Sequence, residues 1–203
     1  MKASNTVANL QGTDRDVAVK QLIPTAQSYE SLRSLFKTGD ILGVRGHSFF
    51  SDSIELLTGK HDPLAISHVG VAYWQNDGLW LAQELQGQGF TCSPMSQTVE
   101  SFLESGDKCF WLQAPDSVRT QADHIVKVIS TYRVTKSLDH YGYGTLPRVL
   151  IDEKINPTQI ASKEVCSTFA QECWESTGYI FKPTRLIPPQ GFKSLVQSIV
   201  EIN

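Results

Sequence analysis

The stretch Ser67-His-Val-Gly-Val-Ala-Tyr-Trp-Gln-Asn-Asp-Gly-Leu-Trp-Leu-Ala-Gln-Glu-Leu85 contains two strand-like runs separated by a turn signal. Apolar, β-branched and aromatic residues dominate both runs, and a loop of Asn, Asp and Gly between them is typical of a β-hairpin. We expect a three-residue loop from Asn76 to Gly78, with Gly78 in the left-handed conformation and Gln75 paired with Leu79. The stretch therefore predicts an antiparallel sheet.

This register gives the hairpin one apolar face and one face of small residues. Gly70 lies opposite Glu84, and His68 lies diagonally from Glu84 on the same face, within reach of long side chains. A two-residue loop would instead place His68 and Glu84 on opposite faces. Small residues around one histidine and one carboxylate leave room for another element to pack closely against this face.

A second informative stretch runs from Ala161 to Gly178 and is typical of a helix that begins at Ser162 and ends at Gly178. Cys166 then lies in the first turn, where unpaired amides and the helix dipole stabilise a thiolate. A nucleophilic cysteine would suit this position. The alternative is that Cys166 is a small buried residue, as most unpaired cysteines are.

The remaining segments mix helical and strand patterns. We expect strands over 40–45 and 108–113, helices over 28–36, 96–104 and 116–132, and a turn region around 87–94. A last amphipathic helix is expected to carry Phe192, Leu195, Val196, Ile199 and Val200. We expect a lead-in with a short helix over residues 1–36 and a single domain over residues 37–203.

Composition limits the function classes. The chain has 203 residues, 40% hydrophobic, with a formal net charge of -3 and a pI near 5.9, so we expect neither a nucleic-acid partner nor an anionic-membrane surface. No apolar run is long enough for a transmembrane helix, so stable membrane insertion is not expected. The N-terminal residues lack the apolar core of a secretory signal. We therefore expect a cytoplasmic location, or delivery without a signal peptide by a phage particle or a secretion machinery.

The four cysteines stand at irregular positions and form no C-x-x-C pair, so a structural zinc site is not expected. A zinc site made from His47, His61 and His68 with one cysteine can be drawn, but no ligand spacing supports it. We expect no cofactor.

The functional interpretation depends on a cysteine at a helix start, a histidine on the hairpin face and a carboxylate on that same face. A thiol needs a base to hold it as thiolate, and the imidazole needs an acceptor that orients it. Cys166, His68 and Glu84 are the candidates for these three roles. The alternative for Glu84 is a solvated carboxylate on an edge strand, and His68 alone would more often be structural.

Five short motifs occur in a characteristic order along the chain: Gly39-Asp-Ile-Leu42, Ser67-His-Val-Gly-Val71, Glu84, Tyr141-Gly-Tyr-Gly144 and Val165-Cys-Ser167. This set resembles the circularly permuted NlpC-type, papain-like cysteine hydrolases, which are related to the lecithin retinol acyltransferase-like proteins. In that group the histidine precedes the cysteine, as it does here. The resemblance spans roughly residues 37 to 180 and implies a papain-like α+β fold, with the nucleophile helix packed against a small antiparallel sheet.

The resemblance also implies roles for single residues. Cys166 would be the nucleophile, His68 the general base and Glu84 the third, polar member. Tyr141, with Tyr143, would line the substrate site or help to bind the oxyanion. The chain departs from the group after Glu84, where Leu85 and Gln86 replace the usual small residues.

The implied activity is acyl transfer through a cysteine thioester, with a peptide or cell-wall amide bond as the leading substrate. One alternative is a lipid acyl hydrolase or acyltransferase, which would need an exposed apolar segment such as Trp74, Leu79 and Trp80. The other is a papain-fold binding or phage structural protein in which Cys166 is merely buried. The sequence leaves the oligomeric state open.

Overall fold

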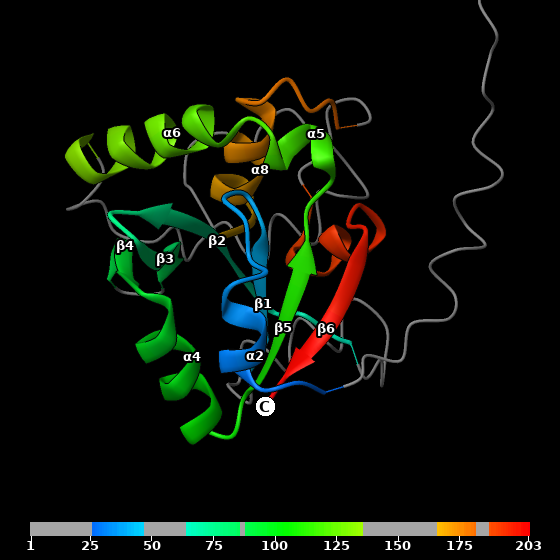
Figure 1. The fold of residues 1–203 in the computed structure, drawn as a ribbon. Helices are drawn as coiled ribbons and strands as arrows, with labels where there is room; N and C mark the ends of the chain where they lie inside the picture. Colours follow the sequence, from blue (N-terminus) through cyan, green and yellow to red (C-terminus); the bar gives the residue numbers. More distant parts are fainter. Residues whose placement is uncertain (1–25, 47–63, 86–87, 136–165, 182–186) are drawn as a thin grey trace, which may run out of the picture.

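The computed structural model describes residues 26–46, 64–85, 88–135, 166–181 and 187–203. They form an α+β fold in which a six-stranded antiparallel sheet has the strand order β4-β3-β2-β1-β5-β6 (Figure 1). The strands are β1 (Ile41–Arg45), β2 (His68–Gln75), β3 (Gly78–Leu85), β4 (Gly89–Pro94), β5 (Lys108–Gln113) and β6 (Ser198–Ile202).

Helices cover both faces of the sheet, because residues that alternate along each strand belong to two different cores. In β5, Phe110 and Leu112 pack with α6 (Ala122–Thr135) and α8 (Cys166–Glu175). Cys109 and Trp111 pack on the other face with α2 (Tyr29–Arg33) and α4 (Met95–Glu104). Figure 1 shows α6 and α8 together above the sheet and α4 at its lower end. The other described helices are α5 (Asp116–Arg119) and the 3₁₀ helix η3 (Pro189–Ser194).

The segment before β1 belongs to the second of these cores. Ser28 caps α2 by accepting a hydrogen bond from the Ser31 amide, and Leu32 and Phe36 are fully buried against the sheet. Gln27 forms an isolated parallel bridge with Ile202 at the β6 edge. Residues 27–36 therefore contribute to the core that β1 and β5 share with α4.

Several sequence predictions are confirmed. The expected strands over 40–45 and 108–113, both arms of the hairpin and the helices over 28–36 and 96–104 appear within a few residues of their predicted bounds. The segment expected as one helix over 116–132 consists of α5 and α6, which are separated at Thr120 and Gln121.

The predicted C-terminal helix is wrong. Phe192 lies in η3, which ends at Ser194, and Ser198 begins the strand β6, in which Ile199 and Ile202 are buried. The apolar spacing fits a helix, but the run Ser-Ile-Val-Glu-Ile is rich in β-branched residues, and β5 offers its open edge as a backbone partner. The segment expected as a turn region near Gly89 is likewise a strand, β4, because it pairs with β3 along its whole length.

None of the helices among the described residues combines the length and the apolar character needed to cross a bilayer.

Candidate active site

Cys166 is the first described residue of α8, and the helix start expected at Ser162 lies outside the described residues. Only 2% of Cys166 is exposed. The helix packs on β2 and β3, and at its other end the indole Nε1 of Trp174 donates a hydrogen bond to the carbonyl of Gly39 at 2.9 Å. Gly178, with φ +82°, follows the last turn, as expected for a helix terminator. These contacts fix the helix, and with it Cys166, against the sheet.

His68 is the first residue of β2 and lies opposite Val44 of β1. Ser67 ties this end of the strand to β1, since its amide donates to the Val44 carbonyl at 2.9 Å and its hydroxyl donates to the same oxygen at 3.2 Å. The imidazole forms a side-chain hydrogen bond with Cys166. The predicted meeting of Cys166 with His68, across nearly a hundred residues of chain, is therefore confirmed.

The hairpin register differs from the prediction by one residue. Gln75 pairs with Gly78, so the loop is the two residues Asn76 and Asp77, which both have positive φ (49° and 62°). This is the two-residue turn whose twist matches that of the strands, and Asn and Asp are the side chains that tolerate it best. The expected pairing of Gln75 with Leu79 is wrong.

The register shift replaces Glu84 with Gln83 beside His68. The Nε2 atom of His68 lies 2.9 Å from Oε1 of Gln83, whose side chain is 2% exposed. Glu84 pairs with Phe90 of β4 and is also buried, so it is not the solvated edge-strand carboxylate of the alternative interpretation. Gln83, not Glu84, therefore lies beside His68; the sequence does not indicate it because a three-residue loop shifts the register by one.

The Gln83 contact fixes the protonation of the imidazole. An amide oxygen only accepts hydrogen bonds, so Nε2 of His68 carries a proton. Nδ1 is then the ring nitrogen that remains to take the proton of the Cys166 thiol. Neutral His68 is therefore the tautomer with its proton on Nε2, and its unprotonated Nδ1 can accept a proton from Cys166.

Electrostatics couple the two groups. Burial by itself lowers the pKa of His68, but the negative charge of the Cys166 thiolate and hydrogen bonds to Cys166 and Gln83 outweigh it and raise that pKa above its ordinary value. This attraction is mutual, so an imidazolium at His68 favours a thiolate at Cys166.

The surroundings of the other three cysteines disfavour the thiolate. Burial raises the pKa of the Cys92 thiol, and it raises the pKa of Cys109 to about 12. Burial also raises the pKa of Cys173, two helical turns after Cys166, well above the ordinary value. These thiols are held in the protonated form, in which a cysteine is a poor nucleophile.

Phe102 of α4 closes the side of the site next to the histidine. Its ring centroid lies 6.3 Å from that of the His68 imidazole, and the two rings are tilted by 49°. An apolar ring here limits the access of water to the hydrogen bond between His68 and Gln83, which strengthens that bond.

Other predicted site residues lie outside the described residues. These are Tyr141, Tyr143 and Ser162, together with His47 and His61 of the zinc alternative. Within the part of the chain that the structure describes, no group of three or more His, Cys, Asp or Glu side chains is arranged to hold a metal ion.

Comparison with known proteins gives a fold but no family. No family model and no curated protein matches the sequence. The crystal structure of metalloprotein yiiX from Escherichia coli O157:H7, DUF1105, is similar to this chain with a TM-score of 0.56 and 14% sequence identity, over 82% of this chain and 96% of that chain. At this identity the likeness concerns the fold alone.

Proposed function

We propose that the protein is a cysteine hydrolase of the permuted NlpC-type, papain-like kind, which acts by acyl transfer on a peptide or cell-wall amide bond. The observation that carries the proposal is the continuous chain of hydrogen bonds from Cys166 through His68 to Gln83. A nucleophile, a base and a group that orients the base are the three parts that such a mechanism requires.

In the proposed first half-reaction, His68 takes the thiol proton and the Cys166 sulfur attacks the carbonyl carbon of the amide. A C–S bond forms, and the carbonyl electron pair moves onto oxygen. The positive end of the α8 helix dipole stabilises this oxyanion. Imidazolium then gives its proton to the amide nitrogen, the C–N bond breaks and the amine leaves, so that a thioester remains on Cys166.

In the second half-reaction, water attacks the thioester carbonyl while His68 takes a proton from it. The C–S bond breaks, a carboxylic acid leaves and the thiolate with its imidazolium partner is restored. Gln83 takes part in neither transfer: its carbonyl oxygen keeps the imidazole oriented and stabilises the imidazolium that forms in each half-reaction. By the resemblance, Tyr141 and Tyr143 would line the substrate site.

An amide substrate is favoured over a lipid because, of the three apolar residues at the hairpin end, Leu79 is buried and Trp74 and Trp80 are half-buried. The Trp74 indole donates a hydrogen bond to the Phe36 carbonyl at 2.9 Å, and the Arg33 guanidinium lies over the indole ring, 5.4 Å from its centroid. Leu79 is buried. The segment that a lipid hydrolase would use for docking thus packs into the protein. Trp80 is half-buried against the core that α8 covers.

The test compares the native protein with Cys166→Ala and with Cys92→Ala as a matched control, on peptide and peptidoglycan-fragment substrates. Both variants should keep the native circular dichroism spectrum and unfolding temperature. Cys166→Ala should abolish release of new amines, and Cys92→Ala should leave it unchanged. Amine release that persists in Cys166→Ala would exclude Cys166 as the nucleophile.

The same comparison distinguishes the non-catalytic alternative. If Cys166 is merely buried, iodoacetamide should modify it no faster than Cys92. If it is a nucleophile, mass spectrometry of tryptic peptides should show Cys166 modified first.

A further inference from the structure

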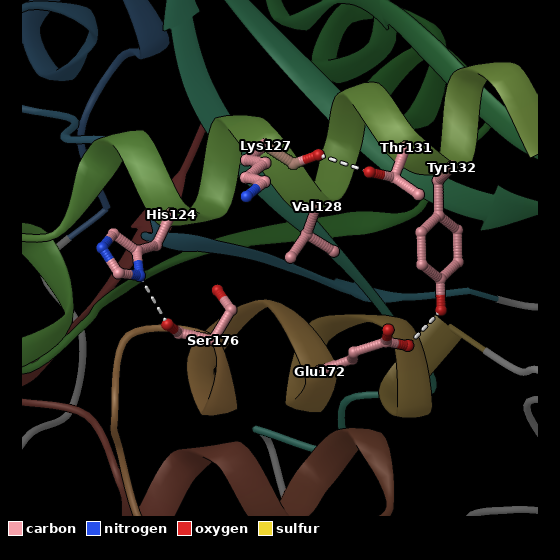
Figure 2. Close-up of a pocket in the computed structure, with 7 residues that line it drawn as sticks. All are labelled: His124, Lys127, Val128, Thr131, Tyr132, Glu172 and Ser176. Carbon is pink, nitrogen blue, oxygen red and sulfur yellow. Dashed lines mark hydrogen bonds between the residues drawn. The ribbon is translucent and has the colours of Figure 1, made fainter.

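A groove runs between α6 and α8 on the outer side of the helix layer (Figure 2). Its volume is about 320 Å³, at the lower end of the roughly 300–1,000 Å³ that is usual for small-molecule sites. None of its lining residues belongs to the site of Cys166, His68 and Gln83. The lining residues that matter here are His124, Lys127, Val128, Tyr132, Glu172 and Ser176.

Hydrogen bonds between the two helices close the groove at both ends. At one end, Nδ1 of His124 lies 2.8 Å from the carbonyl oxygen of Ser176, which only accepts, so that nitrogen carries a proton. At the other end, the Tyr132 hydroxyl donates to the Glu172 carboxylate. Both contacts hold α6 and α8 at a fixed separation, so the groove is part of the fold rather than a chance gap between side chains.

Opposite charges lie on opposite walls of this groove. Figure 2 shows the Lys127 side chain descending from α6, the Glu172 carboxylate rising from α8, and Val128 pointing into the space between the helices. The Lys127 ammonium has no hydrogen-bond or ion-pair partner among the described residues. Tyr132 takes up one oxygen of Glu172, which leaves the second oxygen able to accept. The Ser176 hydroxyl donates to the Cys173 carbonyl and can still accept a hydrogen bond.

We propose that this groove binds a small zwitterion, a free amino acid or short peptide with a small apolar side chain. The ligand carboxylate pairs with Lys127, its ammonium group donates to Glu172, and its side chain contacts Val128. One cation and one anion on the walls match a ligand of both charges better than a simple anion or cation. Because the charged groups are exposed, we expect a dissociation constant on the order of 1 mM.

This ligand class includes the products of amide hydrolysis, yet binding does not depend on the proposed reaction. The test is therefore made on the full chain carrying Cys166→Ala, which cannot turn over the probe. Alanyl-alanine is titrated and followed by amide chemical shifts, with N-acetyl-alanine amide as the probe that lacks both charges. We expect saturable shifts along α6 and α8 with alanyl-alanine and none with the blocked compound.

Variants assign the binding to the groove. Lys127→Gln removes the cation from an exposed position and should weaken binding about two- to fivefold. Glu172→Gln, which keeps an acceptor for Tyr132, should have a similar effect. Lys37→Gln changes an exposed lysine outside the groove and should leave binding unchanged. Equal binding of the blocked compound, unchanged affinity in Lys127→Gln, or no saturable shift with alanyl-alanine would each overturn the proposal.

Discussion

Replacement of Gln83 by alanine is the sharpest test of how the site works. Oε1 of Gln83 accepts from Nε2 of His68 at 2.9 Å in a buried position. A hydrogen bond to a charged group contributes about 1.5–3 kcal/mol, and one to a neutral group about 0.5–1.5 kcal/mol. The difference, about 1–1.5 kcal/mol, is what Gln83 adds to imidazolium over imidazole. In Gln83→Ala, the equilibrium ratio of the thiolate–imidazolium pair to the neutral thiol–imidazole pair should therefore fall about five- to tenfold.

The sign of the effect follows from the pKa of His68. The Gln83 hydrogen bond is one of the contributions that raise this pKa, so its loss lowers it. Imidazolium is then lost at a lower pH, and the thiolate that it stabilises becomes less abundant near neutrality. The pH profile of Cys166 alkylation should accordingly lose amplitude at pH 6 to 7, where a free thiol with a pKa of about 8.5 is almost entirely protonated.

The assay is the rate of iodoacetamide modification of Cys166 from pH 5 to 9, read by mass spectrometry. Gln83→Glu restores an acceptor and should react at least as fast as the native protein at pH 6. Glu84→Gln is the matched control on the neighbouring residue and should leave the rate unchanged. If Gln83→Ala reacts like the native protein while Glu84→Gln slows the reaction, the register and the role of Gln83 are refuted.

Three other substitutions test further contacts of the site and of the core. Phe102→Ala admits water to the histidine and should slow Cys166 alkylation at pH 6 severalfold, whereas Phe102→Leu should retain most of the rate. Asp40→Asn leaves the largely buried Arg119 guanidinium, 3.1 Å from the Asp40 carboxylate, without its counter-charge, and should lower the free energy of unfolding by about 3–5 kcal/mol in urea titrations. Trp174→Phe strands the buried carbonyl that the indole satisfies and should cost about 1–3 kcal/mol in the same measurement.

The sequence could predict the meeting of Cys166 and His68 because strong local signals fixed both positions. Alternating apolar residues placed His68 on a strand of a hairpin, and an apolar stripe placed Cys166 at the start of a helix. A helix that carries Phe169 and Trp174 on one side must bury them, and the sheet is the surface available. The pattern did not predict Gln83, the residue that contacts the other side of the His68 ring.

The error at Glu84 shows why register is hard to predict from a single sequence. Asn76, Asp77 and Gly78 all tolerate left-handed conformations, so the loop can consist of all three residues or of the first two alone. In the structure Gly78 is already a strand residue opposite Gln75, and a side chain there would collide with the Trp80 indole, 2.8 Å from the position of the missing Cβ. Because side chains alternate, this one-residue difference exchanges the carboxylate for the amide.

The helix prediction for the C-terminal segment is wrong for a different reason. Ile199 and Val200 fit the apolar stripe of a short helix, and strand period and helix period are poorly separated over so few residues. The outcome depends on β5, whose outer edge would otherwise expose unpaired backbone groups. A partner that is some ninety residues away along the chain is not visible in a local pattern.

Solvent exposure and thiolate character predict opposite orders of alkylation for Cys92 and Cys166. Cys92 is half-exposed and Cys166 is almost fully buried, so access alone would make Cys92 react first. Thiolate character reverses this order, because burial raises the pKa of Cys92 whereas Cys166 faces an imidazole whose pKa is raised by the thiolate itself. Faster reaction at the more buried thiol cannot arise from access. It requires the ion pair with His68, and that pair is what separates a nucleophile from a structural cysteine at the start of α8.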